Sequence, residues 1–209
     1  MSEAKLKFDE EKHMYTLGNE RLPSVTQLMK DFSNFDAIPK NILERKTKIG
    51  TFTHLAIELY LLGTLDESTL HPDVAIYFNS WLNWWNENKH RIKVLGIEKR
   101  FYHPIYKYAG TIDLHCLWDD VETVIDWKTA IEFSIWYEAQ TAAYQDGLNH
   151  AEGAKVEKRG ALKIKKDGTC EMHWHEDKTD FAAFAGLANF HNWRLNHDTE
   201  YAEQFTSIH

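Results

Sequence analysis

Two acidic residues and one lysine lie close together in the middle of the chain, in segments with the alternating pattern of β-strands. Because alternate side chains of a strand share a face, Asp126 and Lys128 should project together, with Trp127 on the other face. A tight polar turn at Asp119-Asp120 would pair this strand with the preceding one. That turn places Asp113 opposite Asp126, since 113 plus 126 equals 119 plus 120.

This arrangement predicts a divalent-metal site. Two carboxylates at close range repel each other unless a cation lies between them. Oxygen ligands of this kind favour Mg²⁺ or Mn²⁺ over softer metals. A lysine beside the metal could orient or deprotonate an attacking water, or hold the negative charge that develops on a phosphate. An Asp-x-Lys tripeptide is common on exposed strands, however, so the interpretation depends on residues elsewhere.

Three further groups could complete the site. His54 and Glu58 are four residues apart on a predicted helix, at the edge of its apolar stripe. Glu98 precedes the Asp113 strand and could supply a third carboxylate. Gln140 and Tyr144 are also four apart, on the helix expected after Lys128. Each group alone is better explained by a surface ion pair or a half-buried tyrosine, so only their convergence indicates a site.

The periodicity of the chain predicts the elements that position these residues. We expect a short hairpin in the first 22 residues and a helix after Pro23, with Ser24 and Gln27 forming a capping box. The other expected helices span about 39–62, 73–89, 134–150 and 179–196, and the expected strands span 93–102, 108–118, 121–129, 156–165 and 170–175. On the second helix, Leu55, Leu59 and Leu62 should form the buried stripe. Trp81, Trp84 and Trp85 should belong to the core rather than to a base-stacking surface. This order predicts an α/β fold with a central mixed sheet of about five strands flanked by helices.

Composition limits the class of protein. The chain has 209 residues, 43% of them hydrophobic, with a net charge of −8. This length predicts a single domain, residues 1–209, with hairpin and helices to about residue 90 and an αβ core over about 91–209. The two cysteines, and the lack of an apolar segment long enough to span a membrane, favour a reduced, intracellular (cytoplasmic) protein. Two basic clusters offset the acidic balance locally: Lys40, Arg45, Lys46 and Lys48; and Lys155, Lys158, Arg159, Lys163, Lys165 and Lys166.

Four motifs in order resemble the PD-(D/E)XK nuclease superfamily. They are Gly50-Thr51-Phe52-Thr53-His54 continuing to Glu58, Gly110-Thr111-Ile112-Asp113, Asp126-Trp127-Lys128, and Gln140-Thr141-Ala142-Ala143-Tyr144. Within the superfamily the chain is similar to the RecB-like branch, which includes the mitochondrial genome maintenance exonuclease and many phage exonucleases. The resemblance covers most of the chain from Pro23 onward. It implies a restriction-endonuclease-like core to which the His54 helix contributes.

The resemblance also implies roles for individual residues. Asp113 and Asp126 would bind one or two Mg²⁺ or Mn²⁺ ions, with His54 and the Trp127 carbonyl as further ligands. Glu98 and Glu58 are additional candidate ligands. Lys128 would be catalytic, with Gln140 and Tyr144 supporting it or contacting DNA. The candidate DNA-binding residues are Ser24, Thr26, Lys158, Arg159, Lys163 and Lys165. Some RecB-like nucleases carry a four-cysteine iron–sulfur cluster, which the two cysteines here exclude.

The implied activity is metal-dependent exonuclease hydrolysis of DNA phosphodiester bonds, in recombination, repair or genome processing. The substrate would be single- or double-stranded DNA with free ends, in the host cytoplasm if the chain is phage-encoded, and a single-strand annealing protein is a natural partner. Oligomeric state stays open. Three alternatives remain. They are a structure- or sequence-specific endonuclease of the same superfamily, a catalytically inactive DNA-binding relative, and a zinc protein using His173, His175, His115 and Cys116.

Overall fold

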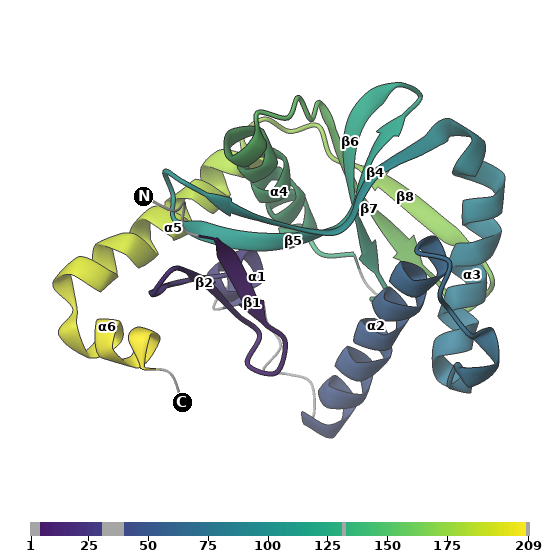
Figure 1. Ribbon diagram of the computed structural model, residues 1–209, viewed down its shortest axis with the longest axis horizontal. Coiled ribbons are helices and arrows are strands. Elements are labelled where there is room, and N and C mark those ends of the chain that lie inside the picture. Colours follow the sequence, from purple (N-terminus) through teal and green to yellow (C-terminus); the bar gives the residue numbers. More distant parts are fainter. Residues whose placement is uncertain (1–4, 31–39, 131–132, 208–209) are drawn as a thin grey trace.

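The computed structural model describes residues 5–30, 40–130 and 133–207, and its centre is a five-stranded sheet in the order β4-β5-β6-β7-β8 (Figure 1). The strands are β4 (Ile92–His103), β5 (Tyr108–Trp118), β6 (Val121–Lys128), β7 (Lys158–Ile164) and β8 (Cys170–Trp174). Only the β6–β7 pair is parallel, and α4 (Trp136–Glu152) crosses between these two strands. The predicted α/β class with a mixed sheet of five strands is therefore confirmed.

Helices cover the sheet on both faces. The first core cluster joins α2 (Lys40–Leu61) and α3 (Pro72–Asn88) to the sheet through Trp81, Trp127 and their neighbours. The second cluster joins α1 (Val25–Met29), α4 and α5 (Asp180–His197) to the sheet through residues such as Phe101 and Tyr108. Trp81, Trp84 and Trp85 are buried, so the expectation that they form core is confirmed.

The turn between β5 and β6 has the conformation that its residues predict. Asp119 and Asp120 have φ angles of 49° and 65°, as in the two-residue turns that suit the twist of a hairpin. The ladder runs from Trp118↔Val121 to Leu114↔Ile125, which is the expected register. Asp113 and Asp126 follow immediately beyond its last pair.

One face of α2 differs from the prediction. Leu55 and Leu62 are 43% and 57% exposed, whereas Ala56 and Ile57 are buried. Apolar residues occur on every side of this helix between positions 52 and 62, so their spacing alone does not determine which side packs on the sheet. The helix itself is continuous through Gly50.

The N-terminal region contains one strand more than the predicted hairpin. It forms a separate sheet of β1 (Leu6–Asp9), β2 (Met14–Leu17) and β3 (Glu20–Leu22). The capping box is confirmed: Ser24 Oγ accepts from Gln27 N, and Gln27 Oε1 accepts from Ser24 N, both at 3.0 Å. The remaining elements are short helices at Glu67–Thr69 and Lys89–Arg91, and α6 (Thr199–Thr206), which the sequence pattern did not predict. Position 39, the expected start of the second helix, lies outside the described residues. Among the described residues, no helix is long and apolar enough to cross a membrane.

Candidate metal centre and active site

Three of the expected metal ligands come together from three elements. His54 on α2 lies with its Nδ1 3.3 Å from Asp113 Oδ1 on β5. One ligand atom each from His54, Asp113 and Glu98 on β4 all lie within 4.8 Å of one another. This spacing would let a single ion contact all three.

Asp113 is held where β5 and β6 separate. Its Oδ2 accepts a hydrogen bond of 2.6 Å from the main-chain N of Trp127, which lies beyond the last paired residues of the two strands. The side chain thus satisfies an amide that the ladder leaves free, while Oδ1 faces His54. The Trp127 indole is 1% exposed within the aromatic core, so only the main chain of this residue is available as a ligand.

Asp126 and Lys128 share a face of β6, as expected. Lys128 Nζ lies 2.6 Å from Asp126 Oδ2. The other oxygen, Oδ1, accepts from Gln140 Nε2 at 3.2 Å, and the same amide lies 2.7 Å from the hydroxyl of Tyr144. The resemblance implied that Gln140 and Tyr144 support the lysine or contact DNA. Both are 5% exposed, which argues against contact with DNA. Gln140 bonds the carboxylate that pairs with Lys128, so support of the lysine stays a prediction.

Glu98 has an unusual backbone for a residue inside a strand. Its φ is +46°, and it lies between the pairs Ile97↔Leu114 and Lys99↔Ile112, opposite Asp113. A left-handed conformation in a non-glycine residue costs roughly 1–3 kcal/mol and persists only where its surroundings impose it. Strain of this kind concentrates at functional sites, and here it lies beside the expected ligands.

The carboxyl groups of the cluster are buried and close enough to shift one another's pKa values. Burial, followed by the charge of Asp113, raises the pKa of Glu98 to about 8. Burial raises the pKa of Asp126 to about 6, with Lys128 opposing the shift and Asp113 adding to it. Burial works against the charged form of His54, but Asp113 outweighs it and raises the pKa to about 9. A divalent cation would relieve this repulsion.

The donor set fits such an ion. It combines one imidazole nitrogen with carboxylate oxygens from Glu98 and Asp113, the oxygen-rich environment that hard divalent cations prefer. Glu58 lies outside the three-residue group, although its charge contributes to the raised pKa of Glu98. The structure therefore brings together His54, Glu98 and Asp113 directly, with Asp126 and Lys128 adjacent.

The predicted DNA-binding residues Lys158 and Arg159 on β7 have different surroundings. Arg159 is 4% exposed, and its guanidinium donates to the Glu138 and Asp177 carbonyls and to Asp180 Oδ2. Arg159 therefore fastens β7 to the helices and is not available to a DNA backbone, which corrects the prediction. Lys158 Nζ lies 3.8 Å from the centre of the Trp174 ring.

Other predicted DNA contacts have mixed surroundings. Lys163 lies in register with Lys128 on the neighbouring strand, whereas Lys165 is paired with Glu171 at 2.9 Å. Ser24 is 3% exposed and engaged in the capping box, so its burial argues against a DNA contact, whereas Thr26 is exposed.

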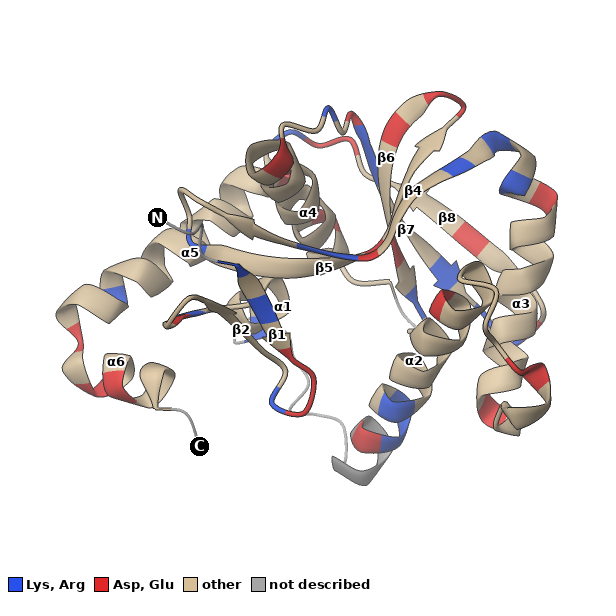
Figure 2. Ribbon diagram, viewed as in Figure 1, with Lys and Arg blue, Asp and Glu red and all other residues tan. Residues whose placement is uncertain are grey.

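A second group of cations is exposed on α2 within three turns before His54 (Figure 2). It consists of Arg45, Lys46 and Lys48, with Arg45 paired to Asp73.

A second histidine–carboxylate cluster lies at the end of β4. His103, Asp146 and His150 also place one ligand atom each within 4.8 Å of one another. His103 is fully buried, and its Nε2 lies 2.9 Å from Asp146 Oδ2.

The residues suggested for a zinc site do not form a three-ligand group among the residues that the structure describes. His115 pairs with Glu122, and His175 Nδ1 contacts Thr141.

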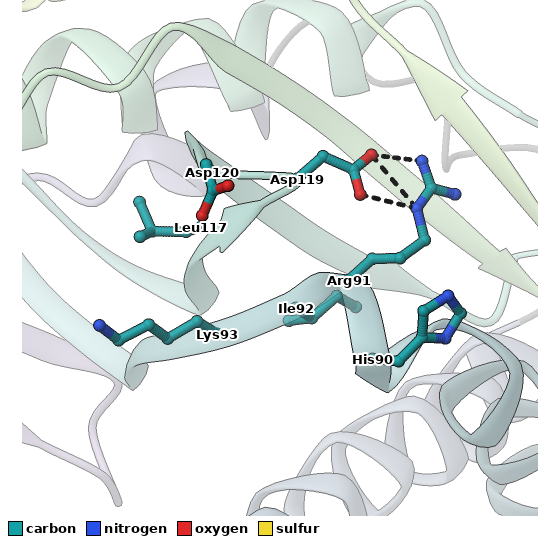
Figure 3. Close-up of a pocket in the computed structure, with 7 residues that line it drawn as sticks. All are labelled: His90, Arg91, Ile92, Lys93, Leu117, Asp119 and Asp120. Carbon is teal, nitrogen blue, oxygen red and sulfur yellow. Dashed lines mark hydrogen bonds and ion pairs between the residues drawn. The ribbon is translucent and has the colours of Figure 1, made fainter.

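A surface pocket of about 510 Å³ lies away from these clusters, beside the turn between β5 and β6 (Figure 3). Arg91 in its wall is paired with Asp119, and Lys93 extends away from that pair. The pocket contains none of the expected site residues.

Comparison with known proteins gives a likeness of fold. No family model matches the sequence, and no curated protein matches it. Solved structures do match, among them the crystal structure of a "putative exonuclease" from Eubacterium rectale, with a TM-score of 0.50 and 9% sequence identity, covering 75% of this chain and 67% of that one. The chain thus has an α/β, nuclease-like fold, and at this identity the likeness concerns the fold alone.

Proposed function

We propose that the chain is a divalent-metal-dependent deoxyribonuclease of the PD-(D/E)XK superfamily, RecB-like branch, acting as an exonuclease. The observation that carries the proposal is the buried meeting of Asp113, Asp126 and Lys128 with His54 and Glu98. The fold of the Eubacterium rectale protein supports it independently. The substrate class that follows is DNA with a free end.

Each residue has a defined part in this proposal. His54, Glu98, Asp113 and Asp126 would hold one or two Mg²⁺ or Mn²⁺ ions, which would supply an activated water and neutralise charge on the phosphate. Lys128 would stabilise the negative charge that develops on the phosphate oxygens. Gln140 keeps the Asp126 carboxylate oriented through its hydrogen bond. Lys163 and the exposed cations of α2 would contact the DNA backbone, an interaction that weakens steeply with salt.

Cleavage of end-labelled linear DNA tests the proposal. We expect single- or double-stranded substrates to release mononucleotides or short oligomers with Mg²⁺ or Mn²⁺, and none with EDTA. Lys128→Ala should abolish release, whereas Lys93→Ala, which removes the same charge from the exposed end of β4, should not. Absence of cleavage under all conditions would overturn the nuclease assignment.

A circular substrate distinguishes the alternatives that share this fold. An exonuclease leaves closed circles intact, whereas an endonuclease cuts them. Salt-sensitive binding of DNA without cleavage would instead favour the inactive DNA-binding relative. The presence of both aspartates and the lysine argues against that last reading.

A further inference from the structure

The ammonium group of Lys128 has two close partners, and only one of them is a carboxylate. Nζ lies 2.6 Å from Asp126 Oδ2 and 4.7 Å from the centre of the Tyr137 ring. A cation within about 6 Å of an aromatic ring centre is attracted by the negative face of the ring. The Lys128 side chain is 16% exposed, so water screens this attraction less than it would at the surface.

Tyr137 belongs to the same helix edge that orients Asp126. It lies in the first turn of α4, three residues before Gln140, and residues three apart on a helix are neighbours. Gln140 contacts Asp126, and Tyr137 contacts Lys128, two residues further along β6. One helix edge therefore contacts both functional side chains of the strand.

The Tyr137 ring packs against one neighbouring ring, which a second ring supports in turn. Phe133 packs against it edge to face, with centres 5.0 Å apart and an interplanar angle of 81°. Phe133 in turn stacks on His173 of β8, at 3.9 Å and 16°. This aromatic support runs from the β6–α4 connection to the edge strand of the sheet.

We infer that Tyr137 is a positioning residue for Lys128. Its ring face holds the ammonium group beside the candidate site, by an anchor that does not depend on Asp126. That independence matters because Asp126 is also an expected metal ligand, so its oxygens are shared between two tasks. The inference rests on the proposed nuclease function for its catalytic consequence, but the contact between ring and ammonium group does not.

Two substitutions separate the ring face from the hydroxyl. Tyr137→Phe keeps the aromatic face, so kcat for DNA cleavage should stay within about twofold of the wild type. Tyr137→Leu removes the face, so kcat should fall about tenfold with little change in KM. Rescue by phenylalanine but not by leucine is the expected result, and equal kcat in all three proteins would overturn the inference.

Nuclear magnetic resonance reports the contact without DNA or metal. Ring current should shift the terminal side-chain protons of Lys128 upfield in the wild type and in Tyr137→Phe, with the resonance assigned by its loss in Lys128→Ala. The shift should disappear in Tyr137→Leu. A wild-type resonance at the ordinary lysine position would overturn the inference even if cleavage is observed, whereas a normal ring-current shift in a protein that never cuts DNA would overturn only the proposed function.

A graded series guards against misfolding of the leucine variant. Phenylalanine carrying one, two or three fluorine atoms can be placed at position 137 with almost no change of shape. Each fluorine weakens the negative ring face, so log kcat should fall stepwise with fluorine number. A flat series in folded proteins would show that the ring acts only by filling space.

Discussion

Two clusters of histidine and carboxylate, both with the spacing of a metal site, use their hydrogen-bonding capacity differently. In the cluster at the end of β4, His103 Nδ1 accepts from the main-chain N of Ile105 and of Tyr106, at 3.1 and 3.2 Å. The ring proton therefore resides on Nε2 and is donated to Asp146. Asp146 is also 3.1 Å from His150 Nδ1. In this cluster the atoms that would bind a metal are already engaged.

The cluster at His54 has a different composition. It joins His54 to two carboxylates, Glu98 and Asp113, beside the Asp126–Lys128 pair, and Glu98 has a strained backbone conformation. Burial, followed by repulsion from Asp113, raises the pKa of Glu98 to about 8. The comparison shows that the spacing of ligand atoms alone does not tell the two clusters apart. The two clusters differ instead in the left-handed backbone of Glu98 and in the number of carboxylates that lie close to the histidine.

The largest difference should appear in catalysis. Asp113→Asn should lower the rate of metal-dependent DNA cleavage by about 10³-fold, because the substitution removes a charged ligand worth several kcal/mol. Asp146→Asn should retain cleavage within about threefold at a temperature where it is folded. Initial rates on end-labelled DNA check both, and comparable losses in the two variants would erase the distinction.

Stability should show the reverse order. His103→Leu leaves two main-chain amides and a carboxylate without their partner in a buried place, so the free energy of unfolding should fall by about 3 kcal/mol. Urea denaturation followed by tryptophan fluorescence measures this loss. A fall of less than about 1 kcal/mol would mean that this cluster is not a structural network.

Metal affinity should depend on one histidine and not the other. His54→Ala should weaken Mn²⁺ binding by at least about tenfold, the effect found even for groups that only support a ligand. His150→Ala should leave the affinity within about twofold. Isothermal titration calorimetry in the absence of DNA gives both constants, and a second bound ion lost in His150→Ala would contradict the assignment of the β4 cluster as structural.

The smallest expected effect is a gain in stability when the site residue Glu98 is replaced. Because the pKa of Glu98 is higher in the folded protein than its ordinary value of 4.5, the carboxyl favours folding when protonated and opposes it as the pH rises toward about 8. Glu98→Gln should therefore stabilise the metal-free protein by about 1 kcal/mol or more at pH 8, and much less at pH 4.5. Saturating Mg²⁺ should remove the advantage. Chemical denaturation at the two pH values, with and without metal, is the measurement. A loss of stability at pH 8 would contradict the destabilising effect of a charged, buried Glu98.

Sequence alone predicted the parts of this architecture that depend on local order. The turn at Asp119-Asp120 and the strand alternation predicted the register of β5 and β6, and the shared face of Asp126 and Lys128 follows from the same alternation. These features could be inferred because a strand has period two and a two-residue turn leaves one register.

Features that depend on how helices pack on the sheet could not be inferred in this way. The burial of Arg159 arises from partners on α4 and α5 that are not its neighbours in sequence. The contact between Tyr137 and Lys128 depends equally on the angle at which α4 crosses β6. The left-handed backbone of Glu98 has no signal in a segment that reads as an ordinary strand.

The side chain of Trp127 links the candidate active site to the correct alignment of β6. Its indole is buried among Trp81 and Trp84, while the residues on either side of it carry the proposed chemistry. A slip of β6 by one residue would exchange these environments, placing two charges among tryptophans and an indole among the polar residues of the candidate site. Such a mispaired chain would have little chance of persisting as a folded but inactive form. Recovery of activity after refolding would therefore report how many molecules have regained the correct strand alignment.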